Sequence, residues 1–284
     1  MYSAPERRTP SELRVLYEVQ PDVRDVIVEG RVDRRLVSWY LHERGGGRAR
    51  VYAVDDRIDP QSLTSPGSNP GKRDYVIALA QEVGGLEEPS ITCVVDSDRD
   101  GFGANQDEGA SEVLLRTDFG SMDAYAFQQR PLQQMLSVGL GRDFSASTLI
   151  SDLTPLLVDL AVARRALHEV GVPVVDRFVR AISKKGGDAR IEVPELIRRS
   201  LAARGESSSL DEVVGRAEYF HSLVPADPRL IIRGHDIAPL IAWHQNLSGD
   251  HARSANLESM MRTSLQASDL DDYPLFQELR RRVC

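Results

Sequence analysis

Acidic side chains gather where three apolar, β-branched runs end, at residues 25–28, 91–95 and 113–116. Clustered carboxylates repel one another and raise one another's pKa, and a divalent cation relieves that repulsion. Oxygen ligands of this kind suit Mg²⁺ or Mn²⁺, which can activate water and stabilise a phosphoryl transition state. The pattern therefore predicts a metal-dependent site that handles phosphate esters. The acidic residues concerned are Glu29, Asp96, Asp98, Asp100, Asp118 and Asp123.

The elements that must position these acids alternate between strand and helix patterns in the first half of the chain. Such alternation predicts an α/β fold with a mainly parallel sheet and helical crossovers. In a parallel sheet the carboxyl ends of the strands lie along one edge, where ligands bind, so the acids are expected to converge there. The predicted strands are 25–28, 51–54, 91–95 and 113–116, and the predicted helices are 11–20, 33–43, 74–83 and 122–136.

The second half of the chain is mostly helical in pattern. Only 189–193 and 230–232 resemble strands there. We therefore predict an α/β domain over 1–145 and a helical domain over 146–284. The predicted helices are 149–170, 194–204, 209–223, 236–246, 254–266 and 274–283.

Other interpretations of the acidic pattern are weaker. The stretch DSDRDG opens like an EF-hand loop with Asp107 at its twelfth position, but a strand precedes it and Gly103 replaces the usual aliphatic residue. A receiver domain or phosphatase would carry aspartates, not Glu29, after its first strand. Any single acid could also be only a helix cap. Lys72 follows a polar loop and either contacts substrate phosphate or caps its helix, since a leading glycine at P-loop spacing is missing.

The order VIVEGRVD, then a crossover, then VVDSDRDG resembles the TOPRIM domain of topoisomerases, primases and related nucleases. Glu29, Asp96 and Asp98 fall on the acidic positions of that family, and Asp100 on a further one found in some members. The similarity is greatest to the TOPRIM-like nucleases of the PARIS anti-phage system. It rests on EGxxD at the first strand and a helical C-terminal part containing GHD, together with the residues Gly71, Lys72, Thr117, Asp118 and Asp123.

The resemblance implies a Mg²⁺- or Mn²⁺-dependent nuclease that cuts transfer RNA or DNA and works with an ABC-type ATPase subunit. It assigns catalysis and metal binding to Glu29, Asp96 and Asp98, with Asp100 as a further ligand and Glu29 also a candidate acid or base. It places Lys72, Asp118 and Asp123 at the substrate. The alternative is a non-catalytic TOPRIM-like module that only docks on the ATPase. The roles of His235 and of the Asp55–Asp56 pair stay open.

Composition limits the class of protein. The formal charge of −8 argues against a protein that coats nucleic acid nonspecifically. No apolar run approaches the roughly 20 residues of a membrane span, and the first residues show no secretory signal. With two cysteines, Cys93 and Cys284, neither a disulfide framework nor a cysteine zinc site is expected, and the cytoplasm is the predicted location.

The acidic charge also predicts that a second body supplies phosphate contacts, either the ATPase or another copy in a homodimer. A leucine-rich pattern in the predicted helix 149–170 could provide that interface, or could instead form the core of its own domain. The leucines are Leu149, Leu153, Leu156, Leu157 and Leu160.

Overall fold

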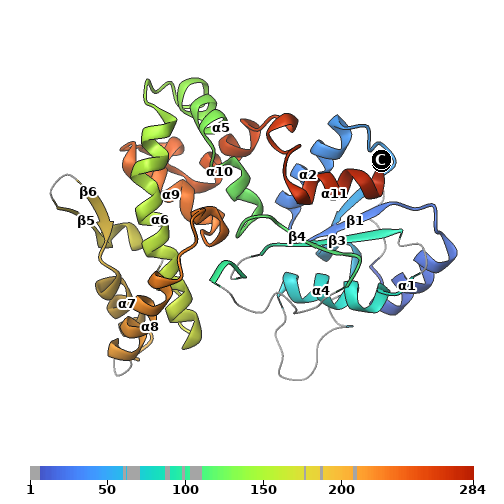
Figure 1. The fold of residues 1–284 in the computed structure, drawn as a ribbon, viewed down its shortest axis with the longest axis horizontal. Coiled ribbons are helices and arrows are strands. Elements are labelled where there is room, and N and C mark those ends of the chain that lie inside the picture. The colour runs from blue at the N-terminus through green and yellow to red at the C-terminus, as the bar shows by residue number, and fades with distance from the viewer. Residues whose placement is uncertain are drawn as a thin grey trace. The chain divides into compact units, whose positions relative to one another are not determined.

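The structure is a computed structural model that divides into two compact units (Figure 1). It describes residues 7–59, 62, 71–86, 90–97, 100–102, 111–175, 177–185, 188–206 and 210–284. Unit 1 comprises 1–97, 105–118 and 267–284, and unit 2 comprises 98–104 and 119–266. The predicted split at 145 differs from this division, because residues 119–145 pack with the helical unit and the last residues return to the α/β unit.

Unit 1 contains a parallel four-stranded sheet, as predicted, with strand order β2-β1-β3-β4. Every residue of β1 and β3 is buried, because helices cover both faces of the sheet at these central strands. The strands are β1 (Asp25–Val28), β2 (Arg50–Ala53), β3 (Ile91–Val95) and β4 (Leu114–Arg116).

The helices of unit 1 form layers on either side of the sheet, with α1 and α4 on one side and α2 and α11 on the other (Figure 1). On the first side, Leu13 and Tyr17 of α1 share a core with Leu79 and Val83 of α4. The helices are α1 (Pro10–Val19), α2 (Arg31–Glu43), α3 (Val54–Arg57), α4 (Lys72–Val83) and α11 (Pro274–Val283).

The EGxxD segment has a local structural explanation. The backbone N–H of Gly30 donates to Asp33 Oδ2 at 2.9 Å, which caps the start of α2. A Cβ at Gly30 would lie 2.9 Å from that same oxygen, so a larger residue would crowd the cap. The same arrangement begins α4, where the N–H of Gly71 donates to Asp74 Oδ2 at 2.7 Å. Two of the glycines that suggested the family therefore also start helices.

The C-terminal helix α11 belongs to unit 1 through contacts with α2. The rings of Tyr40 and Phe276 meet edge to face with centroids 4.7 Å apart. Arg44 Nε donates to Asp271 Oδ1 at 2.8 Å, and the Tyr40 hydroxyl donates to the same oxygen at 3.0 Å. This carboxylate holds Arg44 in place, and the guanidinium in turn keeps the pKa of Asp271 below its ordinary value. These contacts correct the assignment of residues 274–283 to the helical domain.

Unit 2 is built around the long helix α6, which packs against α7, α8, α9 and β6. The five leucines of the predicted pattern are at most 1% exposed inside this unit, so they form its core and not an interface. The helices and strands are α5 (Gln129–Gln134), α6 (Ala146–Glu169), β5 (Ile182–Lys185), β6 (Asp188–Ile191), α7 (Val193–Ala202), α8 (Leu210–Ser222), α9 (Gly234–His244) and α10 (Ser254–Thr263). Short 3-10 or π turns are η2 (Asp100–Phe102), η3 (Met122–Ala126), η4 (Met135–Gly139), η5 (Phe178–Ala181), η7 (Pro228–Leu230), η8 (Gly249–Ala252) and, in unit 1, η9 (Ala267–Asp269).

Among the described residues, α6 has the length and apolar composition of a membrane span. Over half of its most apolar window is buried inside the unit, which is the pattern of a core helix in a soluble protein. It also carries Asp159, which is 6% exposed and accepts a hydrogen bond from the Ile191 N–H at 3.1 Å.

Three predicted elements of the second unit differ in the structure. The strand expected at 189–193 is β6, whose antiparallel partner β5 was not predicted. The apolar residues 230–232 form no strand. The turn η7 ends at Leu230, and the next two residues, Ile231 and Ile232, are buried but pair with no described strand. The helix expected over 122–136 breaks after η3, and Pro131 lies in the first turn of the new helix α5, where a proline is tolerated.

Candidate functional site

Glu29 and Asp96 lie together at the carboxyl edge of the sheet in unit 1. Glu29 follows β1 and Asp96 follows β3, and these two strands are neighbours with Val28 opposite Val94. The backbone N–H of Asp96 donates to Glu29 Oε1 at 2.8 Å. Both residues are partly buried. The structure thus brings together the two acids that the sequence analysis placed at this edge.

The strand order makes this edge a natural binding position. The chain runs from β1 outward to β2, and β3 then lies on the other side of β1. At such a switch point the connections leave in opposite directions, and a crevice opens beyond the carboxyl ends of the two strands. Glu29 and Asp96 flank this point, so their carboxylates border the position where ligands bind in sheets of this topology.

Neighbouring side chains hold the ends of the strands. The N–H of Ser97 donates to the Thr117 hydroxyl at 2.9 Å, and the Ser97 hydroxyl donates to the Thr117 carbonyl. Because Ser97 follows β3 and Thr117 follows β4, the pair ties these strands together at the candidate edge. Arg73 reaches the same edge from α4 and donates from Nε to the Asp96 carbonyl at 3.4 Å.

Three other predicted site residues have different outcomes, and of these Asp118 belongs to unit 1 whereas Asp98 and Asp100 belong to unit 2. Asp98 lies outside the described residues, and only the backbone of Asp100 is described, in η2. Asp118 accepts a hydrogen bond from the Leu275 N–H at 3.3 Å, at the first turn of α11. It therefore contributes to a helix cap, which is the alternative that the sequence left open for each acid.

Lys72, expected at the substrate, forms an ion pair with Asp55. Asp56, the residue after Asp55, accepts a hydrogen bond from Arg34 Nη1 at 2.9 Å through Oδ2. Its Oδ1 lies 3.4 Å from Arg31 Nη2. The Asp55–Asp56 pair thus joins the end of β2 to the first turns of α4 and α2. Sequence reasoning missed this role, because the two partners are distant along the chain.

Asp123 belongs to unit 2, not to the unit that holds Glu29 and Asp96. Its Oδ1 accepts from Arg262 Nη1 at 2.8 Å. Gly234 packs directly against it, and a Cβ there would overlap Asp123 and lie 2.7 Å from the Ser121 hydroxyl. In the same GHD stretch, His235 Nδ1 lies 2.9 Å from Glu258 Oε1, and Asp236 accepts two hydrogen bonds from Arg164, each at 2.7 Å. Each residue of GHD therefore has a structural partner.

The ligand atoms of Asp123, His235 and Glu258 lie within 4.8 Å of one another. Such a set could hold a cation, but Arg262 already supplies positive charge, 2.8 Å from Asp123 and 3.9 Å from Glu258. We therefore interpret this cluster as an ion-pair network linking η3, α9 and α10. This network answers the open question of His235, whose hydrogen bond to Glu258 raises its pKa.

This network should make stability depend weakly on pH. The raised pKa means that the folded state binds the His235 proton more tightly, so the stabilisation is complete below the ordinary pKa of 6.5 and is lost as pH rises through the folded value. We expect His235→Gln to lower the melting temperature at about pH 5.5 and to match the wild type at about pH 8.5. The effect should be small, because the side chain is 60% exposed. A difference that grows with pH would contradict this assignment.

In comparisons with known proteins, no protein-family model and no curated protein matches this chain.

Proposed function

We propose that the protein is a Mg²⁺-dependent nuclease that uses the β1–β3 edge of a TOPRIM-like domain. The observation that carries this proposal is the placement of Glu29 and Asp96 on either side of the switch point, joined by a hydrogen bond of 2.8 Å. Hard carboxylate donors at this position suit Mg²⁺ or Mn²⁺.

Glu29 and Asp96 of unit 1 would hold the metal ion. The resemblance implies Asp98 as a third ligand and Asp100 as a further one. When bound, the ion would polarise a phosphodiester and lower the pKa of water. The Asp96 N–H keeps Glu29 turned toward β3, so that one carboxylate oxygen is fixed at the edge. Arg73, anchored near the Asp96 carbonyl, is placed to contact a phosphate oxygen. The ion pair with Asp55 makes Lys72 a weaker candidate for this contact than the sequence suggested.

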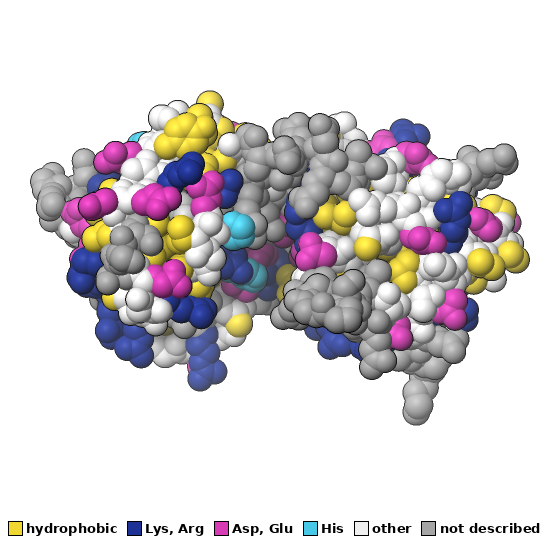
Figure 2. Space-filling view, turned by 90° about the horizontal axis from the view of Figure 1, so that it is seen from below, with side chains coloured by type: hydrophobic (Ala, Val, Ile, Leu, Met, Phe, Trp, Pro, Cys, Tyr) yellow, Lys and Arg dark blue, Asp and Glu magenta, His cyan; other side chains and the backbone are white. Residues whose placement is uncertain are grey.

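The proposed substrate is nucleic acid, either transfer RNA or DNA, and the proposed setting is an anti-phage defence module in the cytoplasm. Figure 2 shows acidic and basic side chains interspersed on the face it presents, with no continuous basic stripe among the coloured side chains. Together with the net charge of −8, this supports dependence on a second body for phosphate contacts. We propose that an ABC-type ATPase subunit, or a second copy of the chain, supplies them.

The direct test is a cleavage assay on transfer RNA and plasmid DNA, with the chain alone and together with its ATPase partner. We expect cleavage in Mg²⁺ or Mn²⁺ and loss of at least about a hundredfold in EDTA, because without the metal the acids repel one another and water is not activated. Adding excess Mg²⁺ should restore the rate. Activity that is equal in EDTA and Mg²⁺ would contradict a metal-dependent nuclease.

The competing proposal is a non-catalytic module that only docks on the ATPase. The helix-capping role of Asp118 and the ion pair of Lys72 favour it, because both residues serve the fold. This proposal predicts that the complex forms and no nucleic acid is cut with either metal, an outcome that the same assay detects.

A further inference from the structure

Unit 2 contains a pocket that the proposed nuclease site does not use. Its volume is about 490 Å³, within the range of small-molecule sites. α6 supplies one wall, the turn after α6 a second, and the segment before α9 a third. The lining residues are Phe102, Gly120, Ala161, Arg164, Arg165, His168, Gly171, Val172, Pro173, Val174, Ile231, Ile232 and Arg233.

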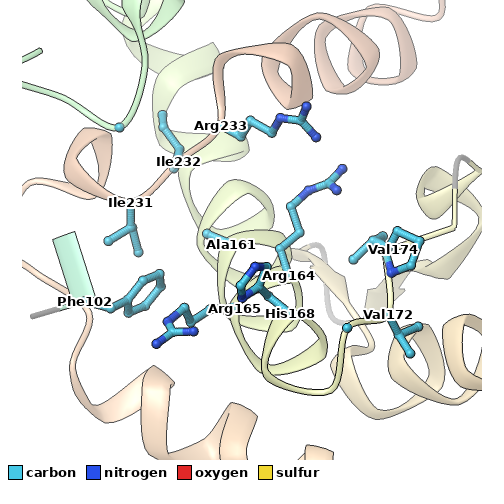
Figure 3. Close-up of a pocket in the computed structure, with 13 residues that line it drawn as sticks. Phe102, Ala161, Arg164, Arg165, His168, Val172, Val174, Ile231, Ile232 and Arg233 are labelled. Atoms are coloured by element: carbon cyan, nitrogen blue, oxygen red, sulfur yellow. The ribbon is translucent and has the colours of Figure 1, made fainter. Parts of the chain in front are cut away.

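The pocket has two chemically distinct ends (Figure 3). Arg164 and Arg233 extend to the same side, away from Phe102, whereas Arg165 lies beside Phe102. Ile231 and Ile232 add an apolar surface between these ends. One end therefore offers the guanidinium groups of Arg164 and Arg233. The other end offers the Phe102 ring and the guanidinium group of Arg165.

The charges of this pocket are not fully compensated. Arg164 is paired with Asp236, and Arg165 lies 3.4 Å from Glu169. Arg233 is exposed, and its side chain forms no ion pair or hydrogen bond with any described residue. None of the described residues that line the pocket is acidic. The excess charge is therefore positive, and Arg233 is the cation most available to a ligand.

The aromatic end also contains an unsatisfied polar atom. Arg165 Nε is buried and makes no hydrogen bond within the described part of the chain. Its guanidinium carbon lies 4.7 Å from the centroid of the Phe220 ring, which in turn meets Phe102 edge to face at 5.6 Å. A buried N–H of a cation without an acceptor is costly, so this end of the pocket lies beside a polar group that the described residues leave unsatisfied.

The wall of the pocket is closely packed. A Cβ at Gly101 would collide with the Leu230 carbonyl, and one at Gly120 would lie 2.7 Å from the Ile232 carbonyl. The N–H of Gly120 also donates to the Arg229 carbonyl at 2.9 Å. These contacts fix Phe102 and the segment before α9 against each other, so the pocket is formed before any ligand arrives.

We propose that this pocket binds a nucleoside phosphate. The phosphate would pair with Arg233, because a guanidinium group can bind phosphate oxygens with two parallel hydrogen bonds. Arg164 keeps its two hydrogen bonds to Asp236 and adds positive charge at the same end. The base would lie against Phe102 and Arg165, because bases stack on aromatic rings and on guanidinium planes. This inference does not depend on the nuclease proposal, which rests on the contact between Glu29 and Asp96 in unit 1.

The test is calorimetric titration of the full chain in EDTA with four nucleoside 5′-monophosphates, with the unphosphorylated nucleosides, and with inorganic phosphate. We expect at least one monophosphate to bind about tenfold or more tightly than its nucleoside and than inorganic phosphate, because it engages both ends. Its affinity should be unchanged in Glu29→Gln, which separates this pocket from the metal edge. Failure of every monophosphate to bind more tightly than inorganic phosphate would overturn the proposal.

Variants locate the binding. Arg233→Ala should weaken binding of the monophosphate by about tenfold or more, since it removes a charged donor to phosphate. Arg204→Ala, an exposed arginine of unit 2 outside the pocket, is the matched control and should bind as the wild type does. Phe102→Leu should weaken the monophosphate but not inorganic phosphate. Both arginines are exposed, so neither variant is expected to disturb the fold. If the Arg233→Ala and Arg204→Ala proteins bound the monophosphate equally well, the ligand would have to bind elsewhere.

Discussion

Glu29→Gln should reduce cleavage of nucleic acid by about a hundredfold or more, the usual scale for loss of a catalytic acid or base. The substitution removes a charge and keeps the shape. In the wild type the Asp96 N–H donates to Glu29 Oε1 at 2.8 Å. The amide oxygen of glutamine can accept the same hydrogen bond, so the edge should keep its geometry. The fold should be preserved, because one fewer carboxylate also means less repulsion at the edge.

The matched control is Glu43→Gln. Glu43 ends the helix that follows Glu29, is exposed, and undergoes the same chemical change far from the strand ends. Initial rates on transfer RNA and plasmid DNA in Mg²⁺ should be normal for Glu43→Gln and lost for Glu29→Gln, with the same circular dichroism spectrum for both. Full activity of Glu29→Gln would remove Glu29 from the mechanism and leave the docking module as the better proposal.

The parts of the fold that could be predicted from the sequence depend on local pattern. β1 and β3 are continuous apolar runs because both of their faces are buried, and both were predicted with their observed bounds. β5 was missed because its sequence ISKK has no apolar run, and a two-stranded hairpin needs none. Residues 230–232 look like a buried strand, yet they are buried by the close approach of Gly101 and Gly120, without a strand partner.

For the candidate site, the sequence predicted which residues follow which strands but not their partners. Glu29 and Asp96 met as expected, because a parallel sheet places the carboxyl ends of its strands at one edge. The cap from Asp118 to α11 and the ion pair of Lys72 with Asp55 depend on contacts between distant segments. No periodicity in the sequence carries that information. The boundary between Asp118 and Phe119, which places Asp123 in unit 2, was missed for the same reason.

A second large effect, on the stability of unit 1, is expected at a buried ion pair that has no part in the proposed catalytic site. Asp25, at the start of β1, is 2% exposed, and Arg57, at the end of α3, is 8% exposed. Arg57 Nη2 lies 3.2 Å from Asp25 Oδ2, which also accepts from the Tyr17 hydroxyl at 3.0 Å. The guanidinium lies over the Tyr52 ring at 4.7 Å. Asp25 Oδ1 has no hydrogen-bond partner among the residues that the structure describes, so the carboxylate depends heavily on Arg57.

Arg57→Met keeps the apolar volume and leaves the Asp25 charge buried without its partner, which typically costs about 3–5 kcal/mol of stability. Urea unfolding can be followed in a Trp243→Phe background, where Trp39 of α2 is the remaining tryptophan and reports on unit 1. Adding Asp25→Asn should recover part of the loss, because no charge is then buried. Arg281→Met, at an exposed pair with Glu278 in the same unit, is the control and should leave the midpoint unchanged.

The pH dependence separates an unpaired charge from a simple packing defect. Burial already raises the pKa of Asp25 above its ordinary value of 3.8, and loss of the Arg57 charge should raise it further. The folded state of Arg57→Met then binds the Asp25 proton more tightly than the unfolded state does, so stability is gained as pH falls through the raised pKa and lost as pH rises. The deficit of Arg57→Met relative to the parent should therefore shrink on acidification toward about pH 4.5, whereas a deficit caused only by altered packing would be the same at every pH.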